Sequence, residues 1–254
     1  AYAGVLEEVL PAAYLDLHGL WSLREALPGV HFPESHDALS QARRRFVYQE
    51  LFVLQLALAV KRHQQSTSRR APVLEATAKI DARIRRLFPF EPTAGQQQAI
   101  AEIAADMSRA VPMNRLLQGD VGSGKTIVAL YAMLLAVAHG YQAVLMAPTE
   151  VLARQHALTV DRLLAHSQVR RTQLIGGLAP ALREAVLTGI SAGNIDLVVG
   201  THALIQEEVK FAKLGLVVID EQHKFGVRQR AMLRQAGLDP HYLVMTATPI
   251  PRTM

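Results

Sequence analysis

The sequence predicts an α/β protein in which helices flank a parallel sheet and a helical region precedes the sheet. From residue 89 to the end, short apolar runs alternate with longer helical patterns, as in doubly wound parallel sheets. The run at 216–219 is continuous and rich in β-branched residues, which is typical of a strand buried on both faces. The expected strands are 115–118, 143–146, 171–175, 196–199, 216–220 and 242–245. The expected helices of this part are 94–108, 125–138, 150–166, 181–188 and 228–235.

The first 88 residues predict helices without strands. Residues 1–40 hold short helical patterns that prolines and glycines interrupt, and residues 73–87 return to a helical pattern. A long helix is expected over 41–65, because its apolar residues recur at helical spacing and it ends in basic residues. Its expected apolar face consists of Phe46, Leu51, Leu54 and Leu58. We therefore expect a helical connector over 1–88 and an α/β domain over 89–254.

Composition limits the class of protein. With 254 residues, half of them hydrophobic, the chain has room for one large or two modest domains. The absence of cysteine excludes disulfides and thiolate metal sites, and no two histidines have the H-x-x-x-H spacing, so we expect no structural metal. The longest apolar stretch, residues 51–60, is too short to cross a bilayer. We therefore expect a cytoplasmic protein with no membrane partner and no stable protein partner, acting as a monomer.

Positive charge is concentrated in one segment. Residues 41–86 contain eleven Lys or Arg and three Asp or Glu, a net charge of +8, whereas the whole chain carries +5. Such a stripe is typical of a surface that meets a phosphate backbone. A solvated helix surface with extended arginine side chains is the alternative interpretation.

A glycine-rich loop follows the first expected strand. Residues 119–126 read G-D-V-G-S-G-K-T and match G-x-x-x-x-G-K-[ST] between a strand and a helix, which is the context that a phosphate-binding loop requires. A chance match on a glycine-rich turn is the alternative. In the phosphate-binding interpretation, Lys125 reaches the β- and γ-phosphates and the Thr126 hydroxyl binds Mg²⁺. The predicted nucleotide contacts are Gly119, Asp120, Val121, Gly122, Ser123, Gly124, Lys125 and Thr126.

Acidic residues follow the expected strand at 216–220. Asp220 is predicted to hold Mg²⁺ through water, and Glu221 to orient the attacking water. An acidic helix N-terminus is the alternative. The strand at 242–245 leads into Thr246, Ala247 and Thr248, where a plain strand exit with threonine hydroxyls is the alternative to a functional motif.

Phe90, Thr93 and Gln96 precede the glycine-rich loop. The amide of Gln96 offers a donor and an acceptor, which suits an adenine edge. Thr93 and Gln96 also have the spacing of a helix capping box. The two roles are compatible, and both stay open from the sequence.

Together these motifs resemble the first motor domain of superfamily-two helicases. Five stretches resemble the RecG family of branch-migrating DNA helicases, namely 119–126, 146–153, 199–206, 218–227 and 245–253. The resemblance implies a RecA-like, P-loop NTPase domain that uses ATP and Mg²⁺ and acts on forks or Holliday junctions in DNA repair and recombination. It implies catalytic roles for Lys125, Asp220, Glu221 and His223, and roles in coupling hydrolysis to movement for Gln222, Thr246, Ala247 and Thr248.

The resemblance also assigns DNA contacts to three loops that follow strands. These are Pro148-Thr149, Gly176-Gly177 and Gly200-Thr201-His202. Ordinary turns between strands and helices are the alternative for each. The family carries a wedge domain before the helical connector and arginines on a second motor domain, so we expect this chain by itself to hydrolyse ATP very slowly.

Other functions fit the sequence less well. A GTPase predicts an N-K-x-D box and a transporter ATPase an L-S-G-G-Q string, and the sequence has neither. A transcription-repair coupling translocase is expected to have Glu where this chain has Gln222 and an aromatic residue where it has Ser123. An isolated nucleotide- or DNA-binding module without turnover remains an alternative.

Overall fold

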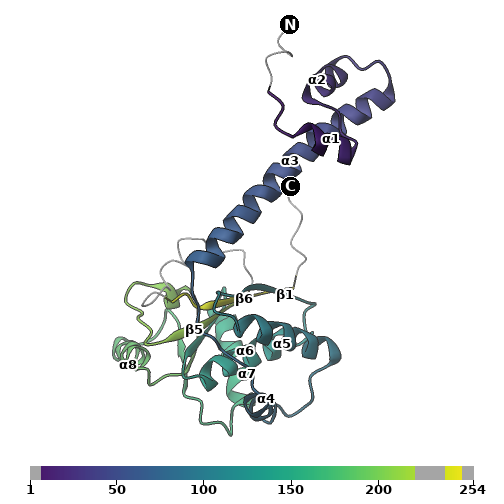
Figure 1. The fold of residues 1–254 in the computed structure, drawn as a ribbon. Helices are drawn as coiled ribbons and strands as arrows, with labels where there is room; N and C mark the ends of the chain where they lie inside the picture. Colours follow the sequence, from purple (N-terminus) through teal and green to yellow (C-terminus); the bar gives the residue numbers. More distant parts are fainter. Residues whose placement is uncertain (1–6, 221–237, 248–254) are drawn as a thin grey trace. The chain divides into compact units, whose positions relative to one another are not determined.

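The computed structural model describes residues 7–220 and 238–247, without the side chains at positions 62 and 64–68. It divides into two compact units, residues 1–68 and 69–254 (Figure 1). Residues 69–88 pack with the second unit, because Leu74, Ile84 and Phe88 are buried in its core. The functional boundary predicted between residues 88 and 89 stays a prediction.

The described part of the first unit, from residue 7 onward, contains three helices, α1 (Ala12–His18), α2 (Leu23–His31) and α3 (His36–Ser68). A capping box between Ser22 and Glu25 starts α2, a pairing that stabilises a helix by about 1 kcal/mol. A small apolar cluster joins α1 to α3. Its buried members are Leu10, Leu15 and Leu20, which pack against Tyr14, Tyr48 and Phe52.

Helix α3 differs from the prediction in its start and in its buried face. It begins at His36, where the Ser35 hydroxyl accepts a hydrogen bond from the Ala38 amide at 3.1 Å. Three of the four residues of the predicted apolar face are exposed, Leu51 at 56%, Leu54 at 54% and Leu58 at 39%, and Phe46 is half-buried. The buried positions are Ala42 and Arg45, because α1 and α2 cover only the first turns of α3. Arg45 is paired with Glu8 at 2.5 Å, which compensates the burial of its charge.

The second unit contains a six-stranded parallel sheet with the order β1-β6-β5-β2-β4-β3. The strands are β1 (Asn114–Gln118), β2 (Gln142–Met146), β3 (Arg171–Leu174), β4 (Leu197–Gly200), β5 (Leu214–Asp220) and β6 (His241–Thr246). All six predicted strands are confirmed within two residues at each end. The predicted RecA-like α/β fold is therefore confirmed.

The described helices of this unit are α4 (Ala78–Arg85), α5 (Ala94–Met107), α6 (Lys125–Ala138), α7 (Glu150–Leu163) and α8 (Pro180–Ser191), with a short 3-10 helix η1 (His202–Ile205). The helical pattern at 73–87 is wrong for its first five residues. Residues 73–77 lie outside any helix, and the amide of Leu74 donates to the Met107 carbonyl at 2.9 Å. The Thr77 hydroxyl then caps α4 by accepting from the Ile80 amide. The helix predicted at 228–235 lies outside the described residues.

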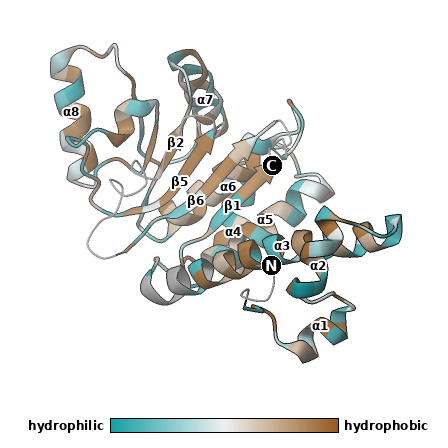
Figure 2. Ribbon diagram, turned by 90° about the horizontal axis from the view of Figure 1, so that it is seen from above, coloured by the Kyte–Doolittle hydropathy of each residue, from teal (hydrophilic) through white to brown (hydrophobic). Residues whose placement is uncertain are grey.

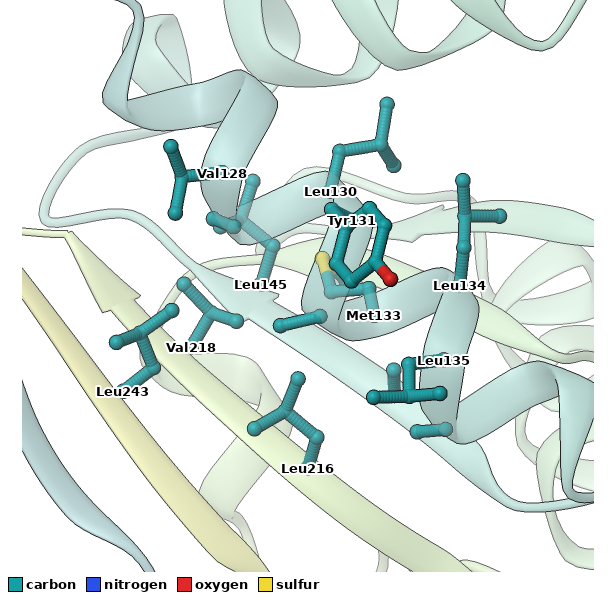
Figure 3. Packing of buried hydrophobic residues seen from close by; sticks show 14 of the residues in the cluster. Val128, Leu130, Tyr131, Met133, Leu134, Leu135, Leu145, Leu216, Val218 and Leu243 are labelled. Atoms are coloured by element: carbon teal, nitrogen blue, oxygen red, sulfur yellow. The ribbon is translucent and has the colours of Figure 1, made fainter. Parts of the chain in front are cut away.

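The core lies on both faces of the sheet. One face packs against α5, α6 and α7, and the other packs against α8 and η1. Figure 2 shows β2, β5 and β6 coloured as hydrophobic between these helices. Helix α6 is buried on every side over residues 127–136, because α4 and α5 cover the side that faces away from the sheet. Figure 3 shows its side chains against Leu145, Leu216 and Val218.

Two buried polar side chains join segments that are distant in sequence. The amide of Gln142 donates to the carbonyls of Ile190 and Ile195, at 3.0 and 2.7 Å, and accepts from two further backbone amides. His241 Nε2 lies 2.8 Å from the Pro72 carbonyl, and its Nδ1 accepts from the Met113 amide at 3.0 Å. These bonds fix the amino-terminal edge of the sheet, the edge opposite the predicted site.

Candidate nucleotide and nucleic-acid site

Most of the predicted site residues that the structure describes come from strand ends and loops at the carboxyl edge of the sheet, whereas Phe90 and Gln96 come from the segment before β1. Because all six strands are parallel, the segments that follow them emerge at one edge. The strand order separates two groups. The glycine-rich loop, Thr246 and Asp220 follow β1, β6 and β5, whereas the three predicted DNA loops follow β2, β4 and β3.

The glycine-rich loop adopts a conformation that depends on its glycines. Gly122 and Gly124 have φ angles of +82° and +80°, in the left-handed region that favours glycine. Lys125 begins α6, and its Nζ atom donates to the carbonyls of Gly119 and Asp120 at 2.6 and 2.7 Å. The loop amides and the positive end of α6 thus stand beside a lysine, which is the arrangement that binds phosphate.

Gln96 connects the preceding helix to this loop. The capping box with Thr93 is confirmed, because Gln96 Oε1 accepts from the Thr93 amide at 2.9 Å. The Nε2 atom of the same side chain donates to the Ser123 carbonyl at 2.9 Å. Phe90 is 47% exposed and stacks on Phe88, with centroids 6.5 Å apart. Contacts of Phe90 and Gln96 with adenine stay predictions.

Asp220, at the end of β5, has a partner that the sequence analysis missed. Its Oδ2 atom lies 2.6 Å from Nε2 of His156, which stands on α7. The two side chains are only 17% and 13% exposed. The sequence did show that β2, the strand before α7, and β5 are both apolar runs followed by predicted site residues. It did not show that the two strands are neighbours in the sheet, which is what brings His156 to Asp220.

Several predicted residues lie outside the described part of the chain. These are Glu221, Gln222, His223 and Thr248. Thr246 is buried at the end of β6, and its carbonyl accepts from the Gly119 amide at 3.3 Å. Ala247 follows it and is half-buried. The strand end is therefore bonded to the start of the glycine-rich loop.

The three loops on the other half of the edge are joined by backbone hydrogen bonds. The Ala147 amide donates to Gly200 at 2.8 Å, and the Thr201 amide to Leu174 at 3.4 Å. A Cβ atom at Gly200 would collide with the Leu174 carbonyl, so this close approach requires glycine. The residues of these loops that face solvent are Thr149, Gly176, Gly177 and His202. The Thr149 hydroxyl also caps α7, accepting from the Leu152 amide at 3.3 Å.

The donor set fits a magnesium nucleotide. Among the described residues no three His, Asp or Glu side chains converge into an all-protein metal cage. Mg²⁺ prefers oxygen ligands and usually keeps waters and substrate phosphates beside one or two protein groups. Thr126, directly after Lys125, and the Oδ1 atom of Asp220 supply such oxygens. In the described ranges no helix combines the length and apolar character needed to span a bilayer.

Comparison with known proteins agrees with this geometry. The DEAD/DEAH box helicase family model matches residues 93–254. RecG from Synechocystis sp. is 46% identical over 98% of this chain and 30% of its own length. RecG from Aquifex aeolicus is 49% identical over 97% of this chain and 32% of its own length.

Solved structures show the same fold. A structure of RecG bound to a three-way DNA junction superposes with a TM-score of 0.83 at 42% identity, covering 98% of this chain and 33% of that one. The helicase MrfA bound to DNA and AMPPNP shares the fold at a TM-score of 0.54 and 19% identity. The chain spans about a third of the length of the curated relatives it matches. By family model, sequence and fold, the chain belongs to the DEAD/DEAH box helicase family, and it is similar to RecG proteins over nearly all of its length.

Proposed function

We propose that this chain is the first motor half of an ATP-dependent DNA helicase that acts on branched DNA, such as reversed forks and Holliday junctions. The observation that supports the proposal is the strand order, in which the glycine-rich loop and the acidic end of β5 lie on one half of a sheet edge and the loops after β2, β4 and β3 lie on the other. A translocating motor needs these two sites side by side. The RecG structure with a three-way junction supports a branched substrate.

In this proposal the chain's residues bind and orient the nucleotide. The amides of 119–124 and Lys125 receive the β- and γ-phosphates, as the positive-φ glycines and the helix N-terminus favour. Thr126 and Asp220 hold magnesium, which when bound neutralises charge on the phosphates. Glu221 orients the attacking water. Five further residues couple the hydrolysis of the nucleotide to movement on DNA, namely Gln222, His223, Thr246, Ala247 and Thr248.

The DNA contacts belong to the loops after β2, β3 and β4. Exposed backbone amides, the Thr201 hydroxyl and the capped start of α7 suit phosphate groups better than base edges. Residues 1–88 act as the connector. A cytoplasmic location and a monomeric state are parts of the same proposal. Light scattering on the protein as it elutes from a size-exclusion column measures its mass and so tests the monomeric state.

Fluorescence anisotropy of a labelled three-way junction tests the proposal, with and without ATP and Mg²⁺ and across a salt series. We expect salt-sensitive binding that changes with nucleotide. Gly177→Asp adds a negative charge at an exposed position where a Cβ meets nothing within 4 Å, and it should weaken binding. Asn114→Asp adds the same charge at the amino-terminal edge of the sheet and should leave binding unchanged.

The alternative outcomes have distinct meanings. A second result is DNA binding that depends on salt but changes neither with nucleotide nor with Gly177→Asp. That result would favour a passive DNA-binding module built on the basic segment 41–86. No binding at low salt would contradict a DNA site on this chain and leave a nucleotide-binding unit.

A further inference from the structure

The contact between His156 and Asp220 is a feature to which neither the motifs nor the comparisons assign a role. Asp220 is the carboxylate at the end of β5, and His156 is the seventh residue of α7, counted from Glu150. The strands β5 and β2 are neighbours in the sheet, and α7 follows β2, which brings the two side chains together across 64 positions of sequence.

The hydrogen bond divides the two oxygens of the carboxylate. Nε2 of His156 lies 2.6 Å from Oδ2. An ionised carboxylate only accepts hydrogen bonds, so the imidazole nitrogen donates. One oxygen is thereby held by the protein, which leaves Oδ1 for a ligand. A carboxylate without such a partner rotates between orientations, which weakens its hold on a metal ion.

Helix α7 does not depend on this bond for its attachment to the sheet. Ala153, Ala157 and Val160 are buried on its inner face, at the spacing of one helical side. Ala153 also accepts a hydrogen bond from Gln173 through its carbonyl, at 3.4 Å. The apolar contacts already anchor the helix, so the bond from His156 serves the carboxylate.

We propose that His156 is a positioning residue that orients the Asp220 carboxylate toward the magnesium ion of a bound nucleotide. The proposal rests on the proposed nucleotide-binding function and goes beyond it by adding a residue from the helix that starts at a predicted DNA loop. His156 does not touch the nucleotide. It acts by fixing the orientation of Asp220, as outer-shell partners of metal ligands do.

The test measures the affinity of the chain for a fluorescent ATP analogue, once with MgCl₂ and once with EDTA. The ratio of the two affinities gives the contribution of magnesium to nucleotide binding. Phosphate binding by the glycine-rich loop is present in both measurements and cancels in the ratio. His156→Leu and His156→Asn remove a donor within reach of Asp220, and His156→Gln keeps an N–H at similar reach. Thermal melting of each variant reports on the fold.

We expect the magnesium-dependent ratio to fall by roughly 10- to 100-fold in the Leu and Asn variants, by analogy with other metal-ligand partners. The affinity in EDTA should stay at the wild-type value, and the Gln variant should restore the ratio. An unchanged ratio in the Leu and Asn variants would overturn the proposal. An equal loss with and without magnesium, together with a lower melting temperature, would show a structural role and overturn it as well. A wild-type chain that binds no nucleotide would overturn the nucleotide function itself, together with this inference.

Discussion

The side-chain amide of Gln96 occupies the space where a Cβ atom on Gly124 would lie. The same amide donates to the Ser123 carbonyl at 2.9 Å, so the start of α5 is bonded to the glycine-rich loop one residue before Gly124. The third residue of α5 therefore packs against the residue that caps α6, at the predicted nucleotide site.

Gly124→Ala should damage the loop in two ways. A Cβ is strained at a φ of +80°, which costs about 1–2 kcal/mol, and it would displace Gln96. We expect weaker binding of a fluorescent ATP analogue and a lower melting temperature. Gly95→Ala is the matched control, because a Cβ there meets nothing within 4 Å and alanine favours the helix. Equal effects of the two substitutions would contradict the close packing described here.

Lys125→Ala should abolish nucleotide binding while the fold persists. The Lys125 side chain donates only to two carbonyls of its own loop and contributes nothing to the apolar core. Loss of these bonds should lower the melting temperature by only a few degrees, at roughly 2–4 °C per kcal/mol for a unit of this size. Lys79→Ala, at an exposed position of α4, is the control for both measurements. A large drop in melting temperature without nucleotide would refute a purely phosphate-binding role.

Gln142→Leu should destabilise the unit at the edge opposite the site. The buried amide satisfies the carbonyls of Ile190 and Ile195 and the amides of Ala212 and Lys213. Leaving such groups unpaired should cost at least about 2 kcal/mol of unfolding free energy, measured by urea denaturation. The exposed Gln98→Leu should change stability little. At urea concentrations too low to unfold the variant, its affinity for nucleotide should stay unchanged, since Gln142 lies at the opposite end of β2 from the carboxyl edge.

The stability of residues 69–254 should depend on pH through His241. Burial of the ring lowers the pKa of His241, outweighing its bond to Pro72 and the charge of Asp106. The unfolded chain then takes up a proton near pH 6.5 that the folded chain resists, so stability is complete above about pH 6.5 and falls below it. Urea midpoints between pH 7.5 and 5 measure this fall, whose slope is at most about 1.4 kcal/mol per pH unit. His241→Gln should flatten the profile, and an unchanged slope in that variant would assign the dependence to other groups.

The sheet was predictable mainly because four of its strands, β2, β4, β5 and β6, are largely apolar, whereas β1 and β3 mix polar and apolar residues. The bounds of α6 matched at both ends, since Gly124 precedes the helix and Gly140, with φ at +75°, follows it. The predicted start of α3 at residue 41 was wrong: the residue before it, Ser40, is a possible cap in sequence, but the structure shows that Ser35 accepts the capping bond. Local sequence does not distinguish two such candidates.

The part of the site that one continuous motif forms was predictable from the sequence. The part that forms where two distant segments meet was not. The glycine-rich loop contains its own lysine and hydroxyl within eight residues. The pair of His156 and Asp220 depends on β2 lying beside β5, which the order of the runs along the chain does not state. The exposed face of α3 was mispredicted for the same reason, because an apolar stripe does not say which neighbour covers it.

The burial of α6 on every side has a kinetic consequence. Amide protons of a helix enclosed by the sheet, α4 and α5 exchange with solvent only when a large part of the unit opens, so they should be among the slowest to exchange deuterium. The glycine-rich loop leads into that slow segment, whereas the loop after the four-residue strand β3 carries two exposed glycines, Gly176 and Gly177. Deuterium exchange followed by mass spectrometry should therefore be much slower for the amides of α6 than for those of Gly176 and Gly177.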